Sequence, residues 1–311
     1  MSRANMAFTG IPTFGRAPLV EPVSLWKADV AVLGVPYDAG TGFRPGTRFG
    51  PRAIREMSMR FPYFEPAGGG YFDPDQGRRF LAGVTAVDCG DVDVVYLDLD
   101  RNLALIEEGA REIRRHGALP AVLGGDHSIT YPLVKAFDDE KEISLVHFDA
   151  HLDYRDAFFG VTLAHGSSIR RCAELPHVKN VVSLGIRGLR LGESDLTDAL
   201  AAKSRVITYR QYRAAGPGAL AEALGAGPRR VYVTVDIDVV NPAACPGTGT
   251  PEADGLAVGE LVDLLRLVAT VKDVVGVDLV EVNPSLDSTG ITSLAAAQII
   301  MEFLGQVFSG R

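Results

Sequence analysis

Short apolar runs alternate along the chain with longer segments of helical periodicity. The apolar runs are continuously hydrophobic, a pattern typical of strands that are buried on both faces of a sheet. Because helical segments separate many of these runs, the pattern predicts an α/β fold in which helices cover both faces of a mainly parallel sheet. We expect strands at residues 28–36, 120–125, 143–149, 181–188, 205–209, 231–239 and 274–282.

Helical periodicity is clearest in three segments, at residues 101–117, 255–270 and 291–308. In the first of them, Asp100 is expected to cap the N-terminus, because a short carboxylate accepts hydrogen bonds from free backbone N–H groups. Gly117 is expected to end the same helix, because glycine suits the left-handed position that follows a helix.

The 311 residues are expected to form a single domain, with residues 1–27 as an N-terminal extension. Two stretches rich in glycine and proline, 65–77 and 241–255, are expected to be long loops within it. Neither stretch separates two halves that could each form a core.

The composition excludes several classes of partner and site. With 39 acidic and 31 basic residues the net charge is -8, which argues against a nucleic-acid partner and suits a small cationic substrate. Cys89, Cys172 and Cys245 are widely spaced, so neither a disulfide framework nor a zinc knuckle is indicated. No apolar run is long enough for a membrane span or a signal peptide, so we expect a cytoplasmic protein without a membrane partner.

Clusters of polar residues follow four of the expected strands. In open parallel sheets, ligands bind at the carboxyl ends of the strands, so these clusters are the first place to look for chemistry. They read "GGDHS" (124–128), "DAHLD" (149–153), "DID" (236–238) and "EVNP" (281–284).

The spacing within these clusters predicts a metal centre. Alternate side chains of an extended segment share one side, so the aspartates and histidines of each cluster are expected to converge. Closely spaced aspartates stay ionised only near several positive charges, and the set is too large for one tetrahedral zinc site. Two bridged divalent ions fit it better. The candidate ligands are His127, Asp149, His151, Asp153, Asp236 and Asp238.

The type of ligand bears on the metal. Carboxylates and imidazoles without a thiolate favour Mn²⁺ and leave Zn²⁺, Co²⁺ and Ni²⁺ open. Polar residues at strand ends also cap helices, and His147, in the middle of an expected strand, is interpreted as a core residue with satisfied hydrogen bonds. Because three separate strand ends supply aspartate or histidine, we favour the metal interpretation for the whole set.

The motifs "GGDHS", "FDAHLD", "VDIDVVNP", "PGTGTPE" and "DLVEVNPSLD", in this order, resemble those of the ureohydrolases, the arginase and agmatinase family. The resemblance runs from residue 28 to the final helix. It implies an arginase-like three-layer fold, two manganese ions, and hydrolysis of a linear guanidino compound to urea and a primary amine. It also implies a homo-trimer or homo-hexamer.

The resemblance further implies roles for single residues. One manganese ion would be held by His127, Asp149, Asp153 and Asp236, and the second by His151, Asp149, Asp236 and Asp238. The catalytic residues would be Asp153, Glu281, which pairs with the guanidinium group, and His165, which carries protons to the leaving amine. His165 and Glu281 would contact the substrate, and the loop that contains His165 offers Phe158 as a third contact.

The substrate is suggested by the loop of residues 154–168. Arg155 departs from the asparagine of arginases, so the chain looks closer to agmatinases and guanidino-acid hydrolases. In this loop Asp156 would favour a cationic substrate end and Arg155 an anionic one. Phe158 or Phe159 would set the depth of the pocket.

Agmatine, cleaved to putrescine in polyamine biosynthesis, is our preferred substrate at this point. The alternatives are 4-guanidinobutyrate, 3-guanidinopropionate and, less favoured, arginine. Two other classes remain open: a binuclear amidohydrolase such as a deacetylase, which would not need Glu281, and a non-catalytic homologue.

Overall fold

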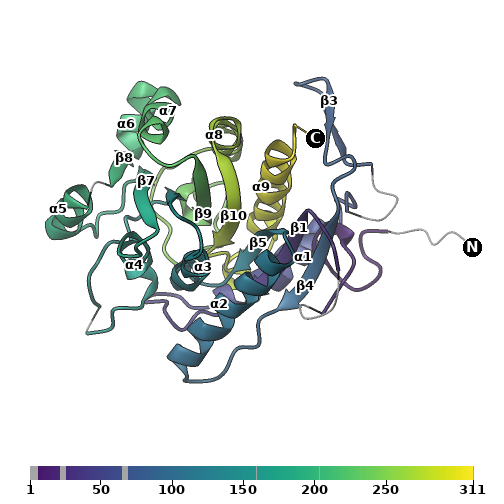
Figure 1. Cartoon of the computed structure of the whole chain (residues 1–311), viewed down its shortest axis with the longest axis horizontal. Coiled ribbons are helices and arrows are strands. Elements are labelled where there is room, and N and C mark those ends of the chain that lie inside the picture. The colour runs from purple at the N-terminus through teal and green to yellow at the C-terminus, as the bar shows by residue number, and fades with distance from the viewer. Residues whose placement is uncertain (1–5, 22–25, 65–68, 159, 203, 311) are drawn as a thin grey trace, which may run out of the picture.

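A sheet of eight strands forms the middle layer of the protein (Figure 1). The computed structural model describes residues 6–21, 26–64, 69–158, 160–202 and 204–310. The strand order is β4-β1-β5-β10-β9-β6-β7-β8, and every neighbouring pair is parallel. The strands are β1 (Val30–Val35), β4 (Ala86–Asp91), β5 (Leu119–Gly124), β6 (Ile143–Phe148), β7 (Val178–Ile186), β8 (Arg205–Thr208), β9 (Arg230–Asp236) and β10 (Asp273–Val280).

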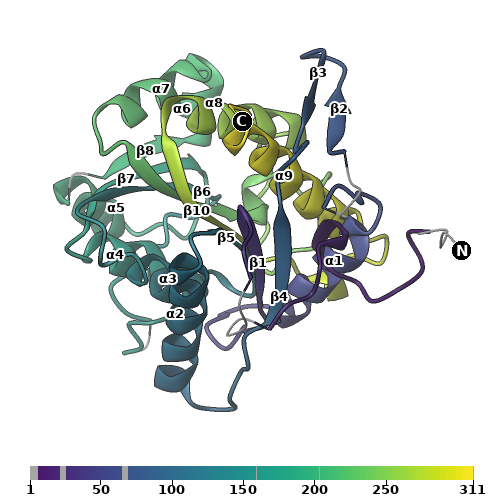
Figure 2. The same ribbon diagram turned by 45° about the vertical axis from the view of Figure 1, so that its right-hand side comes forward.

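Helices cover both faces of the sheet, and each set of helices encloses its own apolar core (Figure 2). One face carries α2 (Leu99–Arg115), α3 (Thr130–Lys135), α4 (Ser168–Ala173) and α5 (Glu193–Ala201). The other carries α1 (Gly50–Ser58), α6 (Tyr209–Ala215), α7 (Gly218–Gly225), α8 (Val258–Val271) and α9 (Ile291–Val307). The predicted three-layer α/β/α fold is confirmed.

The strand order brings the four predicted polar clusters together at one edge of the sheet. Strands β1 and β6 are buried along their whole length, as their continuous apolar sequences predict. Strand β10 lies between β5 and β9, and β6 follows β9. The four strands that the polar clusters follow are therefore adjacent, and their carboxyl ends meet at one edge of the sheet.

The structure differs from the prediction in two places. A short hairpin of β2 (Tyr71–Asp73) and β3 (Arg78–Phe80) occupies part of the expected loop 65–77, of which 65–68 lie outside the described residues. The edge strand β4 was not predicted, because its sequence "AVDCGD" is too polar. Its Asp88 is nevertheless fully buried, since two nitrogens of the Arg55 guanidinium donate to it, each at 2.9 Å.

The predicted N-cap of α2 is wrong. Asp98 accepts a hydrogen bond from the backbone N–H of Arg101 at 3.0 Å, so the helix begins at Leu99. Asp100 lies in its first turn. Gly117, with φ of 74°, follows the end of the helix as predicted.

The three cysteines are free and buried. Among the described residues, no helix is both long and apolar enough to cross a membrane.

Asp287 holds the start of the long helix α9. Its carboxylate accepts hydrogen bonds from the backbone N–H groups of Thr289, Gly290 and Thr292, at 3.0, 3.2 and 2.8 Å. Burial opposes ionisation, but these donors and the threonine hydroxyls outweigh it and lower the pKa of Asp287 to about 2.

We expect Asp287→Ala to lower the free energy of unfolding at pH 7 by about 1 to 2 kcal/mol, as for other lost helix caps. The pKa of Asp287 is lower in the folded than in the unfolded protein, so this stabilisation is present at neutral pH. It is lost as the pH falls from about 4, the ordinary carboxyl value, towards 2. Urea unfolding at several pH values should therefore show that the free energy of unfolding of the variant approaches that of wild type in acid. The exposed Asp263→Ala is the control, with an expected change within about 0.5 kcal/mol. If Asp287→Ala lowers the free energy of unfolding by the same amount at every pH, this account is contradicted.

Candidate metal centre and substrate cavity

The six predicted metal ligands converge at the carboxyl edge of the sheet. His127 lies in the 3-10 turn η3 (His127–Ile129) after β5, and Asp236 ends β9. Asp238 lies in the turn η5 (Ile237–Val239), and the remaining three ligands follow β6.

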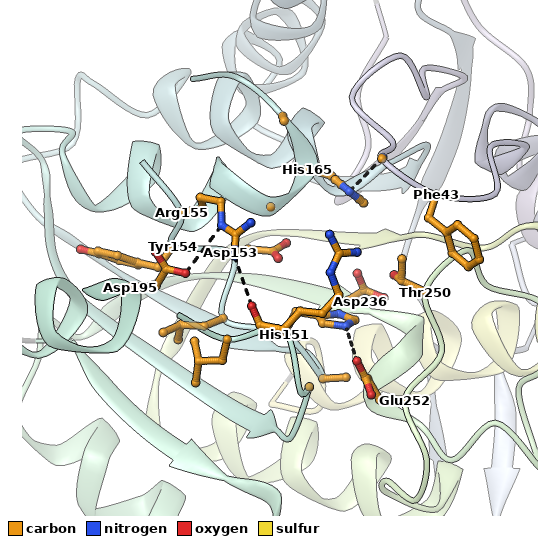
Figure 3. A pocket seen from close by; sticks show the side chains of 18 of the residues that line it. Phe43, His151, Asp153, Tyr154, Arg155, His165, Asp195, Asp236, Thr250 and Glu252 are labelled. Carbon is orange, nitrogen blue, oxygen red and sulfur yellow. Dashed lines mark hydrogen bonds and ion pairs between the residues drawn. The ribbon is translucent and has the colours of Figure 1, made fainter. Parts of the chain in front are cut away.

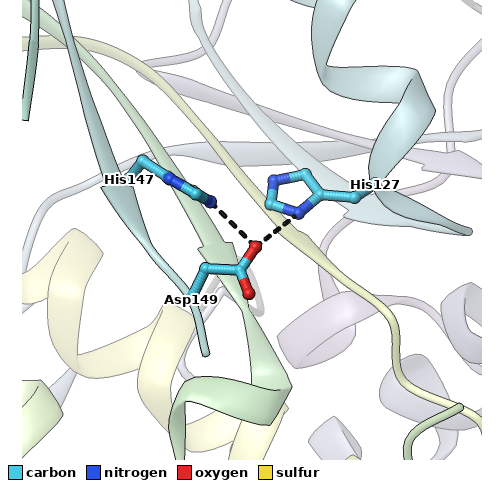
Figure 4. Close-up of side chains that lie close together, drawn as sticks. All are labelled: His127, His147 and Asp149. Atoms are coloured by element: carbon cyan, nitrogen blue, oxygen red, sulfur yellow. Dashed lines mark hydrogen bonds and ion pairs between the residues drawn. The ribbon is translucent and has the colours of Figure 1, made fainter. Parts of the chain in front are cut away.

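One group of contacts surrounds His127. Its Nδ1 atom lies 3.1 Å from Asp149 Oδ2 (Figure 4). The same nitrogen lies 3.2 Å from Asp153 Oδ2 and 3.3 Å from Asp236 Oδ2. Three carboxylates from two strands thus face one imidazole nitrogen.

A second group surrounds His151. Its Nδ1 atom lies 3.0 Å from Asp238 Oδ2 and 3.4 Å from Asp149 Oδ1. The two oxygens of Asp149 therefore face different histidines. This arrangement suits a carboxylate that bridges two cations.

Buried carboxylates repel one another in this centre, so added positive charge would stabilise it. Burial, together with repulsion from Asp238 and Asp149, raises the pKa of Asp236 well above its usual range. Burial likewise raises the pKa of Asp238. Burial also acts on Asp149, but its contacts with His127, His147 and His151 outweigh it and hold its pKa well below the usual value.

The donor atoms fit divalent cations. The buried Nδ1 atom of His127 has no hydrogen-bond partner within the described part of the chain, although carboxylate oxygens surround it. A cation among these atoms would satisfy the nitrogen and offset the repulsion between the carboxylates. Imidazole nitrogens and carboxylate oxygens suit Mn²⁺, Zn²⁺, Co²⁺ and Ni²⁺.

Turns, rather than extended strands, bring the ligands together, which corrects the expected geometry. Strand β6 ends at Phe148, and Asp153 has a left-handed backbone with φ of 50°. Strand β9 ends at Asp236, whose Oδ1 accepts a hydrogen bond from the backbone N–H of Asp238 at 2.8 Å. Strand alternation alone would not place these carboxylates.

His147 is buried and satisfied, in agreement with its interpretation as a core residue. It also supports the site, because its Nε2 lies 2.8 Å from Asp149 Oδ2 (Figure 4). Its Nδ1 lies 3.0 Å from Ser183 Oγ. His147 lies on β6 and Asp149 directly follows the strand, so their spacing of two residues is the sequence signal for this contact.

Glu281 follows β10 in a left-handed conformation with φ of 64°, which is costly for a non-glycine residue. Its Oε1 accepts a hydrogen bond from the backbone N–H of His127 at 3.0 Å. Its buried Oε2 has no hydrogen-bond donor among the residues described. An unsatisfied carboxylate oxygen on a strained backbone is typical of a functional site.

His165 has both ring nitrogens engaged. Its Nδ1 lies 3.1 Å from Glu281 Oε1. Its Nε2, which points away from Glu281, accepts a hydrogen bond from the backbone N–H of Gly42 at 3.1 Å (Figure 3). Burial lowers the pKa of His165, but the contact with Glu281 outweighs this effect and raises it to about 9. Protonation adds a hydrogen at Nε2, so proton uptake must break the bond from Gly42.

A cavity of about 400 Å³ opens over this centre (Figure 3). Its shielded wall includes Asp153 and Asp236, whose side chains are 11% and 4% exposed. Arg155, with a side chain 36% exposed, and the exposed Arg190 also line it. The most buried charged groups of the cavity are therefore acidic, and its exposed part carries two arginines, one of them near Asp195.

Phe158 lines the cavity, as predicted, and Phe159 lies outside the described residues. The guanidinium carbons of Arg155 and Arg190 lie 5.2 and 5.9 Å from the centre of the Phe158 ring. The expectation for Asp156 is wrong. Its side chain is 66% exposed and pairs at 2.8 Å with Arg171, outside the cavity.

Sequence reasoning missed several residues of the site. Glu252 Oε1 lies 3.3 Å from His151 Nε2, and Asp195 lies 3.8 Å from Arg155. Glu252 belongs to the quoted motif "PGTGTPE", which offered a signal. Asp195 and Arg190 follow β7 without any motif, and only the fold brings them to the cavity.

Comparisons with known proteins agree with this geometry. A family model described as the arginase family matches residues 28–305. The chain is 38% identical over 306 residues to a guanidinobutyrase of Pseudomonas aeruginosa, covering 96% of this chain and 92% of the relative. It is 37% identical over 282 residues to an agmatinase of Bacillus subtilis, covering 89% and 91%. A solved proclavaminate amidinohydrolase from Streptomyces clavuligerus has a TM-score of 0.86 at 35% identity, covering 97% of this chain and 98% of that one.

We expect Asp149→Ala to reduce the number of divalent ions that each chain retains, because its oxygens face both histidines. After Mn²⁺ loading and dialysis, wild type should hold about two ions per chain and the variant one or none. Elemental analysis by mass spectrometry measures this number. The neighbouring Asp156→Ala, outside the cavity, should match wild type. An Asp149→Ala protein that still holds two ions would rule out a shared position for this carboxylate.

Proposed function

Because the chain belongs to the arginase family, we propose that it hydrolyses a linear guanidino acid to urea and an amino acid at a binuclear metal centre. The observation that carries this proposal is the cavity, whose most buried charged groups are acidic and whose exposed part carries two arginines. A substrate with a guanidinium at one end and a carboxylate at the other matches both ends.

We propose Mn²⁺ as the metal. His127, Asp149, Asp153 and Asp236 would hold one ion, and His151, Asp149, Asp236 and Asp238 the other. When bound, a pair of divalent ions lowers the pKa of water and so supplies a nucleophile at neutral pH. Water adds to the guanidinium carbon, the bond from this carbon to the substituted nitrogen breaks, and that nitrogen leaves as the amine.

Glu281 is proposed to orient the guanidinium group. The backbone N–H of His127 and the Nδ1–H of His165 fix Oε1, which leaves Oε2 as a buried acceptor. A guanidinium N–H would satisfy this oxygen through a charge-assisted hydrogen bond. This role distinguishes the proposal from a deacetylase-like activity, which would not need Glu281.

His165 is proposed to deliver the proton to the leaving amine. It lines the cavity, and its raised pKa of about 9 keeps a large fraction protonated at neutral pH once the bond from Gly42 is broken.

The choice of substrate depends on the basic end of the cavity. Arg190 has no acidic partner among the described residues, and Arg155 is only loosely paired with Asp195, at 3.8 Å. Two guanidinium groups beside Phe158 would attract a carboxylate and repel the ammonium group of agmatine. Similarity does not decide between them, because the guanidinobutyrase and the agmatinase are almost equally identical to this chain. Agmatine, preferred from the sequence, remains the alternative, with Asp195 as the group that would meet its ammonium.

Urea release from 4-guanidinobutyrate, 3-guanidinopropionate and agmatine tests this proposal. We expect kcat/KM for one of the acids to exceed that for agmatine by at least about tenfold, a difference of about 1.4 kcal/mol. Arg155→Gln should raise KM for the acid with little change in kcat, because it removes a contact that is equal in the ground and transition states. Asp156→Asn, on the same loop but outside the cavity, is the control. A higher kcat/KM for agmatine would restore the agmatinase assignment.

We expect His165→Asn to lower kcat by about 10² or more, the usual size of a lost proton-transfer group, while metal content stays at the wild-type level. A protonated His165 donates the proton, so wild-type kcat should fall as the pH rises through about 9. This decline should be absent from the variant. The remote His116→Asn should retain both the rate and the pH profile. If His165→Asn keeps the alkaline decline, another group delivers the proton.

A further inference from the structure

A hydrogen-bond chain runs from His127 into the middle of the sheet. The Nε2 atom of His127, on the far side of the ring from the carboxylates, lies 3.0 Å from Thr234 Oγ1. Thr234 lies on β9 and donates to Asp278 Oδ1, on the neighbouring strand β10, at 2.5 Å. All three side chains are completely buried.

The direction of these bonds follows from the hydroxyl groups around Asp278. Besides Thr234, the hydroxyls of Tyr232 and Thr130 donate to its Oδ2 at 2.9 and 3.1 Å. Such convergence suits an acceptor-only carboxylate. A threonine hydroxyl has one hydrogen, and Thr234 gives it to Asp278, so towards His127 it acts as an acceptor.

His127 Nε2 therefore carries the ring hydrogen, and Nδ1 presents a lone pair to the group formed by Asp149, Asp153 and Asp236. We propose that Thr234 and Asp278 are positioning residues that fix the ring orientation and tautomer of His127 for one of the two metal ions. This inference rests on the metal centre of the proposed function and adds residues to it that touch neither ion nor substrate.

The location of Asp278 supports a role in positioning His127. A carboxylate in the middle of an apolar strand is costly to bury, and apolar packing alone would not require one. The other histidine has a different support, because His151 Nε2 faces Glu252, which lines the cavity with a side chain 21% exposed. The buried chain behind His127 should therefore affect one metal position and not the other.

Metal titration of the metal-free protein, followed by electron paramagnetic resonance of free Mn²⁺, tests this role without any substrate. Thr234→Val keeps the side-chain shape but removes the hydroxyl. We expect it to raise Kd for one metal equivalent by about 10- to 100-fold, the usual effect of losing such a support, and to change the other by less than about threefold. Thr234→Ser should restore wild-type binding. Tyr232→Phe is the matched control, because it removes a donor to Asp278 but leaves the link to His127.

A spectroscopic measurement separates positioning from packing. In protein loaded with diamagnetic Zn²⁺, nitrogen-15 NMR of labelled histidine should show a slowly exchanging Nε2–H on His127 in wild type. The signal should persist in Thr234→Ser and Tyr232→Phe and be shifted or lost in Thr234→Val.

Several results would overturn the inference: unchanged binding by folded Thr234→Val, an equal loss in Tyr232→Phe, or no rescue by Thr234→Ser. If Thr234→Val fails to fold, Asp278→Asn replaces it with the same expected loss for one equivalent, and unchanged binding would again refute the role. A wild-type protein that binds no Mn²⁺ or Zn²⁺ would refute the metal centre itself, a failure distinct from wild-type binding that Thr234 does not influence.

Discussion

Asp149, Asp236 and Asp238 are withdrawn from water into one small volume, where their charges repel one another and burial penalises each of them. Two imidazoles stand among these carboxylates, and the Nδ1 atom of His127 faces three of them. The arrangement becomes stable only when positive charge enters it, as protons on the histidines or as metal ions. The surrounding contacts can be understood as means of keeping this crowded group in place.

The parallel sheet provides much of this restraint. Four adjacent strands end at one edge, so ligands far apart in the sequence begin from a common rigid base. The final placement comes from turns, and two site residues, Asp153 and Glu281, adopt left-handed backbones that other side chains rarely take. The hydrogen bond from the His127 backbone to Glu281 connects the candidate metal ligands with the candidate guanidinium acceptor. Backbone hydrogen bonds hold both residues: the Asp153 carbonyl accepts from Ile169 N–H at 3.2 Å, and Glu281 N–H donates to the Gly125 carbonyl at 2.8 Å.

The sequence predicted the buried strands and the clustering of the six candidate ligands because continuous apolar runs and dense polar clusters are local signals. It did not predict β4, because the burial of Asp88 depends on Arg55, 33 residues away. It placed the cap of α2 at Asp100 instead of Asp98, since either aspartate satisfies the same local rule. Asp278 was overlooked for a similar reason. Its neighbours in the sequence are apolar, and the hydroxyls that donate hydrogen bonds to its carboxylate lie on β9 and α3.

Arg155 and Asp156 show where local reasoning about function ends. They are neighbours in the sequence and carry opposite charges, and the direction of the backbone alone places the arginine in the cavity and turns the aspartate to Arg171. The cavity then has acidic groups in its most buried part and two arginines in its exposed part. A guanidino acid interacts favourably with both ends, whereas a dication such as agmatine is attracted at the inner end and repelled at the outer one. Discrimination between a guanidino acid and agmatine would thus come as much from repulsion of agmatine as from attraction of the acid. It would depend on groups such as Arg155, about one substrate length away from the reacting carbon.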